Sequence, residues 1–173
     1  GVSSTNAWSR VEAIAYVSCD LVRSEILARV TANGERRWTD PHNGGLYFQT
    51  SGVEADSELV FTRVTGDSLF TDALAFNFKA INGGEWCILF GCSESQGKAG
   101  FDFGSNYCNL RMLYCGSKEL GCSPVLSDFT SEELYVNSSV IAIHEPSMCF
   151  RGMNVGHLIG LSVTLTLALP LLA

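Results

Sequence analysis

The segment LAFNFKAINGGEWCILF, residues 74–90, indicates the fold most clearly. Apolar and polar side chains alternate over residues 74–81, which is the period of a strand with one buried face. The turn formers NGG at 82–84 lead from there into an apolar run at residues 86–90. The segment is therefore expected to form two antiparallel strands joined by a turn.

Two more candidate strands precede this pair, at residues 46–51 and 58–64. A run of turn formers, WTDPHNGG at residues 38–45, comes before the first of them. Short strands separated by glycine-rich turns are typical of a meander that buries one face. The four segments together predict an antiparallel four-stranded β-meander.

The N-terminal region has a different period. From residue 8 to residue 30, apolar side chains recur every three or four residues, as they do on one face of a helix. Ser9 and Glu12 have the spacing of a capping box, and Asn33-Gly34 is a natural stop. A helix with an apolar stripe and a sheet with an apolar face each need cover, so we expect an α+β fold with an N-terminal amphipathic helix packed on the meander. The stripe consists of Trp8, Val11, Ala15, Cys19, Val22, Ile26 and Val30.

The regular pattern ends near residue 93, where glycine, serine and cysteine become frequent. We interpret residues 93–125 as an irregular segment stapled by disulfides, with a candidate short helix at 109–113. Residues 127–136 are expected to add one short helix or strand. Residues 140–145 are a candidate last strand or part of a stalk.

The chain of 173 residues has the length of one domain. We divide it into a folded extracellular domain at 1–136, a polar stalk at 137–157 and a hydrophobic tail at 158–173. Its 18 acidic and 11 basic residues give a net charge of −7. Binding to nucleic acid requires clustered basic residues, so no nucleic-acid partner is expected.

Seven cysteines are present, and none of their spacings is that of a zinc site. We expect no metal and no cofactor. In an exported protein the cysteines are expected to form disulfides, whose pairing the sequence leaves open. If Cys149 is lost with the tail, six remain for three bridges; alternatively, Cys149 is retained and pairs with Cys19 or Cys122, which leaves one free thiol. The six expected to pair are Cys19, Cys87, Cys92, Cys108, Cys115 and Cys122.

The tail at 158–173 contains no charged residue, but it is shorter than the about 20 residues of a spanning helix. It fits a signal for attachment of glycosylphosphatidylinositol (GPI), with residues 150–157 as the spacer and Ser147 as the site of lipid attachment. Ser138-Ser139 is a second candidate with a longer spacer. The alternatives are a short membrane anchor and a buried terminal helix.

Two other features fit an exported protein. The chain begins at Gly1 without an initiator Met, as a mature protein does after its secretory signal is removed. Asn137-Ser138-Ser139 is an acceptor sequence for N-glycosylation, expected in the stalk.

Three groups of residues are candidates for a catalytic, cation-binding or apolar-ligand site. Asp40 and His42, next to Asn43, place a carboxylate and an imidazole close together, but no nucleophile motif accompanies them. Glu94, Asp102 and Asn106 carry oxygen atoms that could hold Ca²⁺, although their spacing is not that of an EF-hand. A third group of aromatic residues either lines an apolar cavity or fills the core. It comprises Phe48, Phe61, Phe76, Phe78, Trp86 and Phe90.

A resemblance covers residues 38–122. The runs WTDPHNGG at 38–45, CSESQ at 92–96, NYCN at 106–109 and LYCG at 113–116 look like those of a group of small secreted cysteine-containing proteins from unicellular eukaryotes. The resemblance implies export, disulfides and a protist or algal source. It implies no catalytic residue.

Three functions follow as hypotheses. The first is a non-enzymatic secreted or GPI-anchored domain on the outer face of the plasma membrane that acts through protein or glycan contacts. The second is an extracellular carrier of a lipid or other small apolar ligand. The third is a secreted hydrolase that uses Asp40 and His42.

Overall fold

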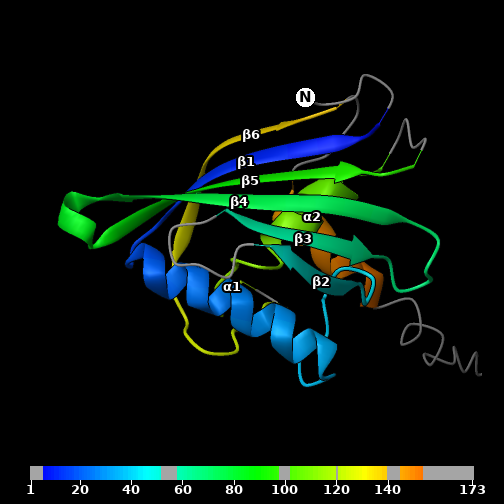
Figure 1. The fold of residues 1–173 in the computed structure, drawn as a ribbon, viewed down its shortest axis with the longest axis horizontal. Helices are drawn as coiled ribbons and strands as arrows, with labels where there is room; N and C mark the ends of the chain where they lie inside the picture. Colours follow the sequence, from blue (N-terminus) through cyan, green and yellow to red (C-terminus); the bar gives the residue numbers. More distant parts are fainter. Residues whose placement is uncertain (1–5, 52–57, 98–101, 120, 140–144, 154–173) are drawn as a thin grey trace, which may run out of the picture.

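One antiparallel sheet organises the chain. The computed structural model describes residues 6–51, 58–97, 102–119, 121–139 and 145–153. In these ranges the strands lie side by side in the order β2-β3-β4-β5-β1-β6, with α1 along one side of the sheet (Figure 1). The elements are β1 (Trp8–Ala15), α1 (Cys19–Gly34), β2 (Leu46–Ser51), β3 (Leu59–Val64), β4 (Thr71–Ile81), η1 (Asn82–Gly84), β5 (Trp86–Ser95), α2 (Ser105–Arg111), β6 (Ser131–Ser138) and η2 (Pro146–Met153).

The predicted α+β class is confirmed, and the four predicted strands are present as the meander β2–β5. The sheet is larger than predicted. β1 pairs along β5, the last strand of the meander, and β6 pairs with the other edge of β1. The predicted four-stranded sheet is therefore a six-stranded one, with β2 and β6 at its edges.

The predicted start of the N-terminal helix is wrong. Residues 8–15 form β1, and the helix begins only at Cys19, after its cap Ser18. The apolar stripe predicted a helix here because Val11 and Ala15, four residues apart, fit both the period of a helix and the two-residue period of a strand. In the structure Val11, Ala13 and Ala15 all face the core, which is the strand alternation. The predicted stop at Gly34 is confirmed.

Both α-helices cover the same face of the sheet. Cys87 of β5 forms a disulfide with Cys19 at the start of α1. Gly91, four residues further along β5 and so on the same face, lies against Leu110 of α2. This inner face holds the core, which is filled by residues such as Val22, Ile26, Leu59, Phe61, Leu74, Phe76, Leu89 and Leu110.

Three disulfides are formed, but not by the predicted six cysteines. Cys19–Cys87 joins α1 to β5, Cys108–Cys149 joins α2 to η2, and Cys115–Cys122 closes a loop after α2. Cys92 is the free cysteine among the described residues, and it is half-buried. Cys92 is next to inward-facing Gly91, so its side chain points to the opposite face of the sheet. Including Cys92 and omitting Cys149 were therefore errors, as was the alternative pairing of Cys149 with Cys19 or Cys122.

The fold extends past the predicted boundary at residue 136. β6 ends at Ser138, and exposed Asn137 pairs with Arg10 of β1 instead of lying in a stalk. Ser147 lies exposed in η2, which the Cys108–Cys149 disulfide fastens to α2. Lipid attachment at Ser147 would cut the backbone between Cys108 and Cys149, so this disulfide alone would hold the severed tail on the domain.

The C-terminal predictions have mixed outcomes. The helix predicted at 109–113 begins earlier, because α2 covers Ser105–Arg111. The element expected at 127–136 is the strand β6. The candidate strand at 140–145 falls mostly outside the described residues, as does the tail at 158–173. Within the described ranges, no helix has the length and apolar character that a membrane crossing needs.

The disulfide pattern gives the first testable prediction. When the protein is produced in an oxidising compartment and alkylated before digestion, mass spectrometry should find the label on Cys92 alone, because the other six sulfurs are bonded. Linked peptides should join the three pairs given above. A labelled Cys149, or a linked peptide that contains Cys92, would contradict this arrangement.

Candidate ligand-binding pocket

A row of buried polar side chains crosses the inner face of the sheet. Tyr47 of β2 is the register partner of Arg63 on β3, Arg63 is the partner of Asp72 on β4, and Asp72 is the partner of Ser95 on β5. Partners in register project on the same face, and all four residues are buried. A buried charge must be paired or hydrogen-bonded, so the partners of this row decide how the region is built.

The Arg63 guanidinium is committed to the loop before β2. Its Nε and Nη2 both donate to Asp40 Oδ2, at 3.0 and 2.5 Å, and side chains of both residues are fully buried. Nη2 also donates to the carbonyl oxygen of His42 at 2.6 Å and to Asn43 Oδ1 at 2.8 Å. Gly45 is required here, because a Cβ at that position would lie 2.3 Å from the guanidinium.

Tyr47 connects this row to both helices. Its ring lies beside the guanidinium, with the centroid 5.4 Å from Arg63 Cζ. Its hydroxyl donates to the Asn109 carbonyl of α2 at 2.9 Å, and its backbone N–H donates to Asn33 Oδ1 of α1 at 2.9 Å. Burial raises the pKa of Tyr47 well above its ordinary value, so the hydroxyl stays a neutral donor.

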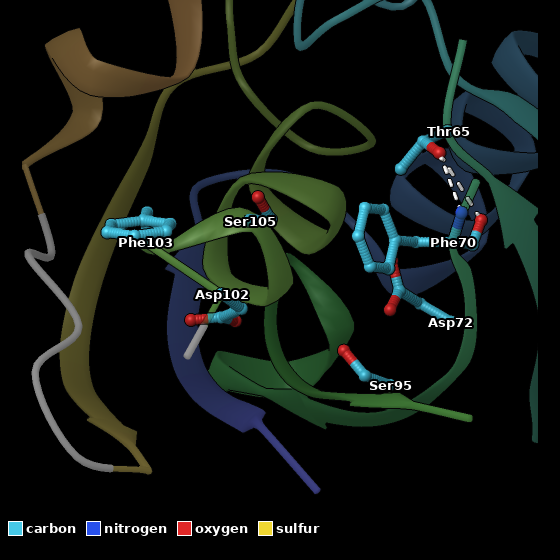
Figure 2. A pocket seen from close by; sticks show the side chains of 7 residues that line it. All are labelled: Thr65, Phe70, Asp72, Ser95, Asp102, Phe103 and Ser105. Carbon is cyan, nitrogen blue, oxygen red and sulfur yellow. Dashed lines mark hydrogen bonds between the residues drawn. The ribbon is translucent and has the colours of Figure 1, made fainter. Parts of the chain in front are cut away.

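A pocket of about 190 Å³ opens at the Asp72 end of the row. It lies between the β3–β4 turn, the adjoining ends of β4 and β5, and the beginning of α2 (Figure 2). The described residues of the lining include two carboxylates and two aromatic side chains, and no Lys, Arg or His is among them. The residues are Thr65, Phe70, Asp72, Ser95, Asp102, Phe103 and Ser105.

Asp72 is the most unusual residue of the pocket. It is only 3% exposed, and its Oδ2 accepts a hydrogen bond of 2.8 Å from Asn109 Nδ2. Its Oδ1 accepts no hydrogen bond from any residue that the structure describes. Arg63 acts on Asp72 through charge alone, since its hydrogen bonds go to the loop before β2. A carboxylate in this position can bind a cationic or hydrogen-donating ligand.

Asp102 has a structural role at the beginning of α2. Its carboxylate accepts from Gly104 N, Asn106 N and Asn106 Nδ2 at 2.8–3.1 Å. Asn106 Nδ2 in turn donates to Ser95 Oγ at 2.9 Å, and Asn106 Oδ1 accepts from Ser93 Oγ at 2.5 Å. These bonds fix the loop and α2 against β5, which sets one wall of the pocket.

The β3–β4 turn holds Phe70 in place at the opposite wall. Thr65 N donates to the Phe70 carbonyl at 3.0 Å, and Phe70 N donates to Thr65 Oγ1 at 3.1 Å. In Figure 2 the Phe70 ring projects towards Ser105 of α2, with the Asp72 carboxylate close to it, whereas the Phe103 ring points away from both. These bonds hold the Phe70 backbone, and its side chain is 55% exposed.

The residues predicted for a hydrolase do not form an acid–base pair. Asp40 accepts from the backbone N–H of His42, not from its imidazole, and its other oxygen binds Arg63. The imidazole nitrogens of His42 are buried and make no hydrogen bond with the described residues. Burial, with the nearby charge of Arg63, lowers the pKa of His42 to about 4. Asp40 is buried as the ion-pair partner of Arg63, and His42 is half-buried beside it in the sequence.

The other two predicted groups also separate. Asp102 and Asn106 do come together, but the Asn106 amide donates to the carboxylate and takes the place that a cation would need. Glu94 alternates with inward-facing Ser93 and Ser95, so it lies on the opposite face of β5. No set of three His, Cys, Asp or Glu suited to a metal occurs in the described part of the chain.

The six aromatic residues do not surround a common cavity. Phe61 and Phe76 are fully buried in the core, with ring centroids 6.4 Å apart. Phe78 stacks on Phe76. Phe48, Trp86 and Phe90 are exposed.

Asp102 was a candidate from the sequence, but the other pocket residues were missed for a simple reason. The predicted strand began at residue 74, yet the same alternation continued two residues back places Asp72 on the buried face with Leu74 and Phe76. A carboxylate at an inward position is the signal that could have identified it. Arg63, two residues after buried Phe61, gives the same signal.

Comparison with protein-family models, with curated proteins and with solved structures finds no match to this chain. The resemblance to small secreted cysteine-containing proteins stays a prediction. What the pocket binds must be inferred from its own geometry.

His42 provides a prediction about pH. Its pKa is about 4 in the fold and 6.5 as the ordinary value, so the unfolded chain binds more protons between these values. The contribution of His42 to stability is complete above pH 6.5 and is lost as the pH falls towards 4. Over that range the wild type should lose about 2–3 kcal/mol more unfolding free energy than His42→Gln, as measured by urea denaturation. Parallel stability curves for the two proteins would contradict the assignment.

Proposed function

We propose that this protein is an exported, non-enzymatic binding domain that holds a small polar ligand in the pocket beside Asp72. The observation that carries the proposal is the buried carboxylate with one oxygen open to a preformed pocket. Ligand sites combine apolar walls with a few placed polar groups, which is the composition of this pocket.

The disulfides support the location. Three disulfides, two of them joining elements far apart in the sequence, are compatible with an extracellular protein. We propose secretion on this basis, with glycosylation at exposed Asn137 on edge strand β6. A glycan there would also hinder strand pairing between molecules.

The size of the pocket bears on the carrier hypothesis. About 190 Å³ is below the roughly 300–1,000 Å³ of pockets for drug-sized ligands. A lipid would not fit, and two carboxylates are poor neighbours for an apolar ligand. A carrier function is therefore proposed for a small polar molecule only. The hydrolase hypothesis receives no support, because Asp40 and His42 are both engaged or enclosed in the core.

A protein or glycan contact remains the second candidate, and a shallow hollow of about 260 Å³ on the outer face of the sheet favours it. Exposed Phe90 and Tyr135 lie there beside Arg10 and Glu12. Aromatic side chains next to charged ones are common at contact surfaces.

The pocket function can be tested by NMR. We would titrate the labelled protein with small amines, alcohols and carboxylic acids, each separately, and follow backbone amides. The proposal predicts shifts concentrated at Asp72, Ser95 and Ser105, and their loss in Ser105→Phe, which fills the pocket. Ser123→Phe, in an exposed loop, is the matched control and should behave as wild type. Shifts confined to Phe90 and Tyr135, or none with any compound, would reject the pocket as the site.

We also propose that the apolar segment 158–173 directs attachment to the outer face of the plasma membrane, with processing after Cys149 instead of at Ser147. The next small residues in the sequence are Gly152, Asn154 and Gly156.

Phosphatidylinositol-specific phospholipase C should release the protein from cells. The C-terminal peptide of the released protein should still contain Cys149 linked to Cys108. Protein that stays on the cells after this treatment, or that ends at Ser147, would contradict the proposal.

A further inference from the structure

We propose that the ligand of the pocket is a small organic cation, whose ammonium group binds Asp72 Oδ1 and lies against the ring of Phe70. This inference rests on the proposed binding function and names the chemical class of the ligand. It is drawn from the charge of the region, the open oxygen of Asp72 and the neighbouring aromatic ring.

Among the described residues around the pocket, carboxylates outnumber positive charges. Asp40, Asp72 and Asp102 supply three carboxylates, whereas Arg63 is the one guanidinium of the described residues in hydrogen-bond contact with any of them. His42 adds no charge at neutral pH. Buried charges are normally paired, so a cation that entered the pocket would find an uncompensated partner in Asp72. The net charge of −7 also favours the approach of cations.

The arrangement of Asp72 suits an ammonium group. Asn109 Nδ2 holds one carboxylate oxygen at 2.8 Å and so fixes the carboxylate plane. The other oxygen is left for a donor from the pocket. A charge-assisted hydrogen bond in a site that is 3% exposed is stronger than one at the surface.

The ring of Phe70 favours an organic cation over a metal ion as the ligand. The face of an aromatic ring attracts a cation within about 6 Å of its centroid. Phe70 and Asp72 both line the pocket, and Figure 2 shows the Phe70 ring projecting towards α2. Ca²⁺ would need about 6–8 oxygen ligands, and the Asp102 carboxylate already accepts three N–H bonds. A ring and one free oxygen fit an alkylammonium better.

The test uses isothermal titration calorimetry on the intact domain with four probes. 2-Phenylethylamine, protonated at pH 7, is compared with 2-phenylethanol, which has the same shape without the charge. CaCl₂ tests the metal ion. A blocked lysine amide tests whether the same ammonium chemistry is presented by a protein side chain instead of a free amine.

Three variants locate the binding. Asp72→Asn keeps an oxygen for Asn109 but removes the charge, and should weaken binding of the amine about 10-fold to 100-fold. Phe70→Leu should weaken it about 2-fold to 5-fold through loss of the ring. Asp20→Asn removes an equal charge from an exposed position in the first turn of α1 and should leave binding unchanged.

Each outcome is decisive. The inference is supported if the amine binds at least about 10-fold more tightly than the alcohol and Asp72→Asn abolishes the difference. Equal binding of amine and alcohol would overturn it and leave the proposed binding function standing. Binding of CaCl₂ alone, or of the lysine amide but not the free amine, would overturn a free organic cation as the ligand. Should Asp72→Asn fail to fold, the amine–alcohol comparison and Phe70→Leu decide the question in a folded protein.

Discussion

The buried ion pair between Arg63 and Asp40 is the interaction on which the rest of the structure depends. It places a guanidinium on the inner sheet face at β3, next to edge strand β2, and ties it to the loop before β2. The loop must then pass close to the guanidinium, which requires Gly45, and Tyr47 must pack beside it. The hydrogen bonds that Arg63 makes go to Asp40, His42 and Asn43, and its Nη1 has no hydrogen-bond partner among the described residues. Asp72 therefore keeps an oxygen to which no described residue donates, and this oxygen gives the pocket its chemistry.

A second buried ion pair, between Arg29 and Glu25 of α1, organises the contacts of that helix with the segment after α2. Arg29 donates to Glu25 and to the carbonyl oxygens of Met112 and Cys115, and burial lowers the pKa of Arg29. Glu25 accepts the backbone N–H groups of residues 125–127 at 2.7–2.8 Å. In this pair every carboxylate oxygen is used, so it fastens the irregular segment to α1 and offers nothing to a ligand. The contrast shows why Asp72 is a candidate site and Glu25 is not.

The sequence was informative where a single period was present. The alternation over residues 74–81 and the glycine-rich turns identified the meander, and the three-to-four spacing after Cys19 identified α1. It failed at residues 8–15, where Val11 and Ala15 satisfy both periods and only the pairing of β1 with β5 decides between them. The prediction of which cysteines form disulfides failed for a related reason. Cys92 and Cys87 are five residues apart on one strand and therefore face opposite sides, which could be known only once β5 was seen to run to Ser95.

The candidate site could be predicted only in part. Inward positions for Arg63 and Asp72 follow from extending the strand alternation, but their adjacency depends on the register of β3 against β4. That Arg63 binds Asp40 and not Asp72 depends on the path of a loop, which no periodicity specifies. Binding sites of this kind combine residues from several elements, and here β4, β5, α2 and the β3–β4 turn all contribute.

A crystal structure of the protein grown with 2-phenylethylamine would test this division of roles between the two aspartates most directly. The account predicts the guanidinium of Arg63 on Asp40 and the ligand nitrogen within hydrogen-bond distance of Asp72 Oδ1, beside the Phe70 ring. A guanidinium turned to pair with Asp72, which leaves no open oxygen for a ligand, would contradict it.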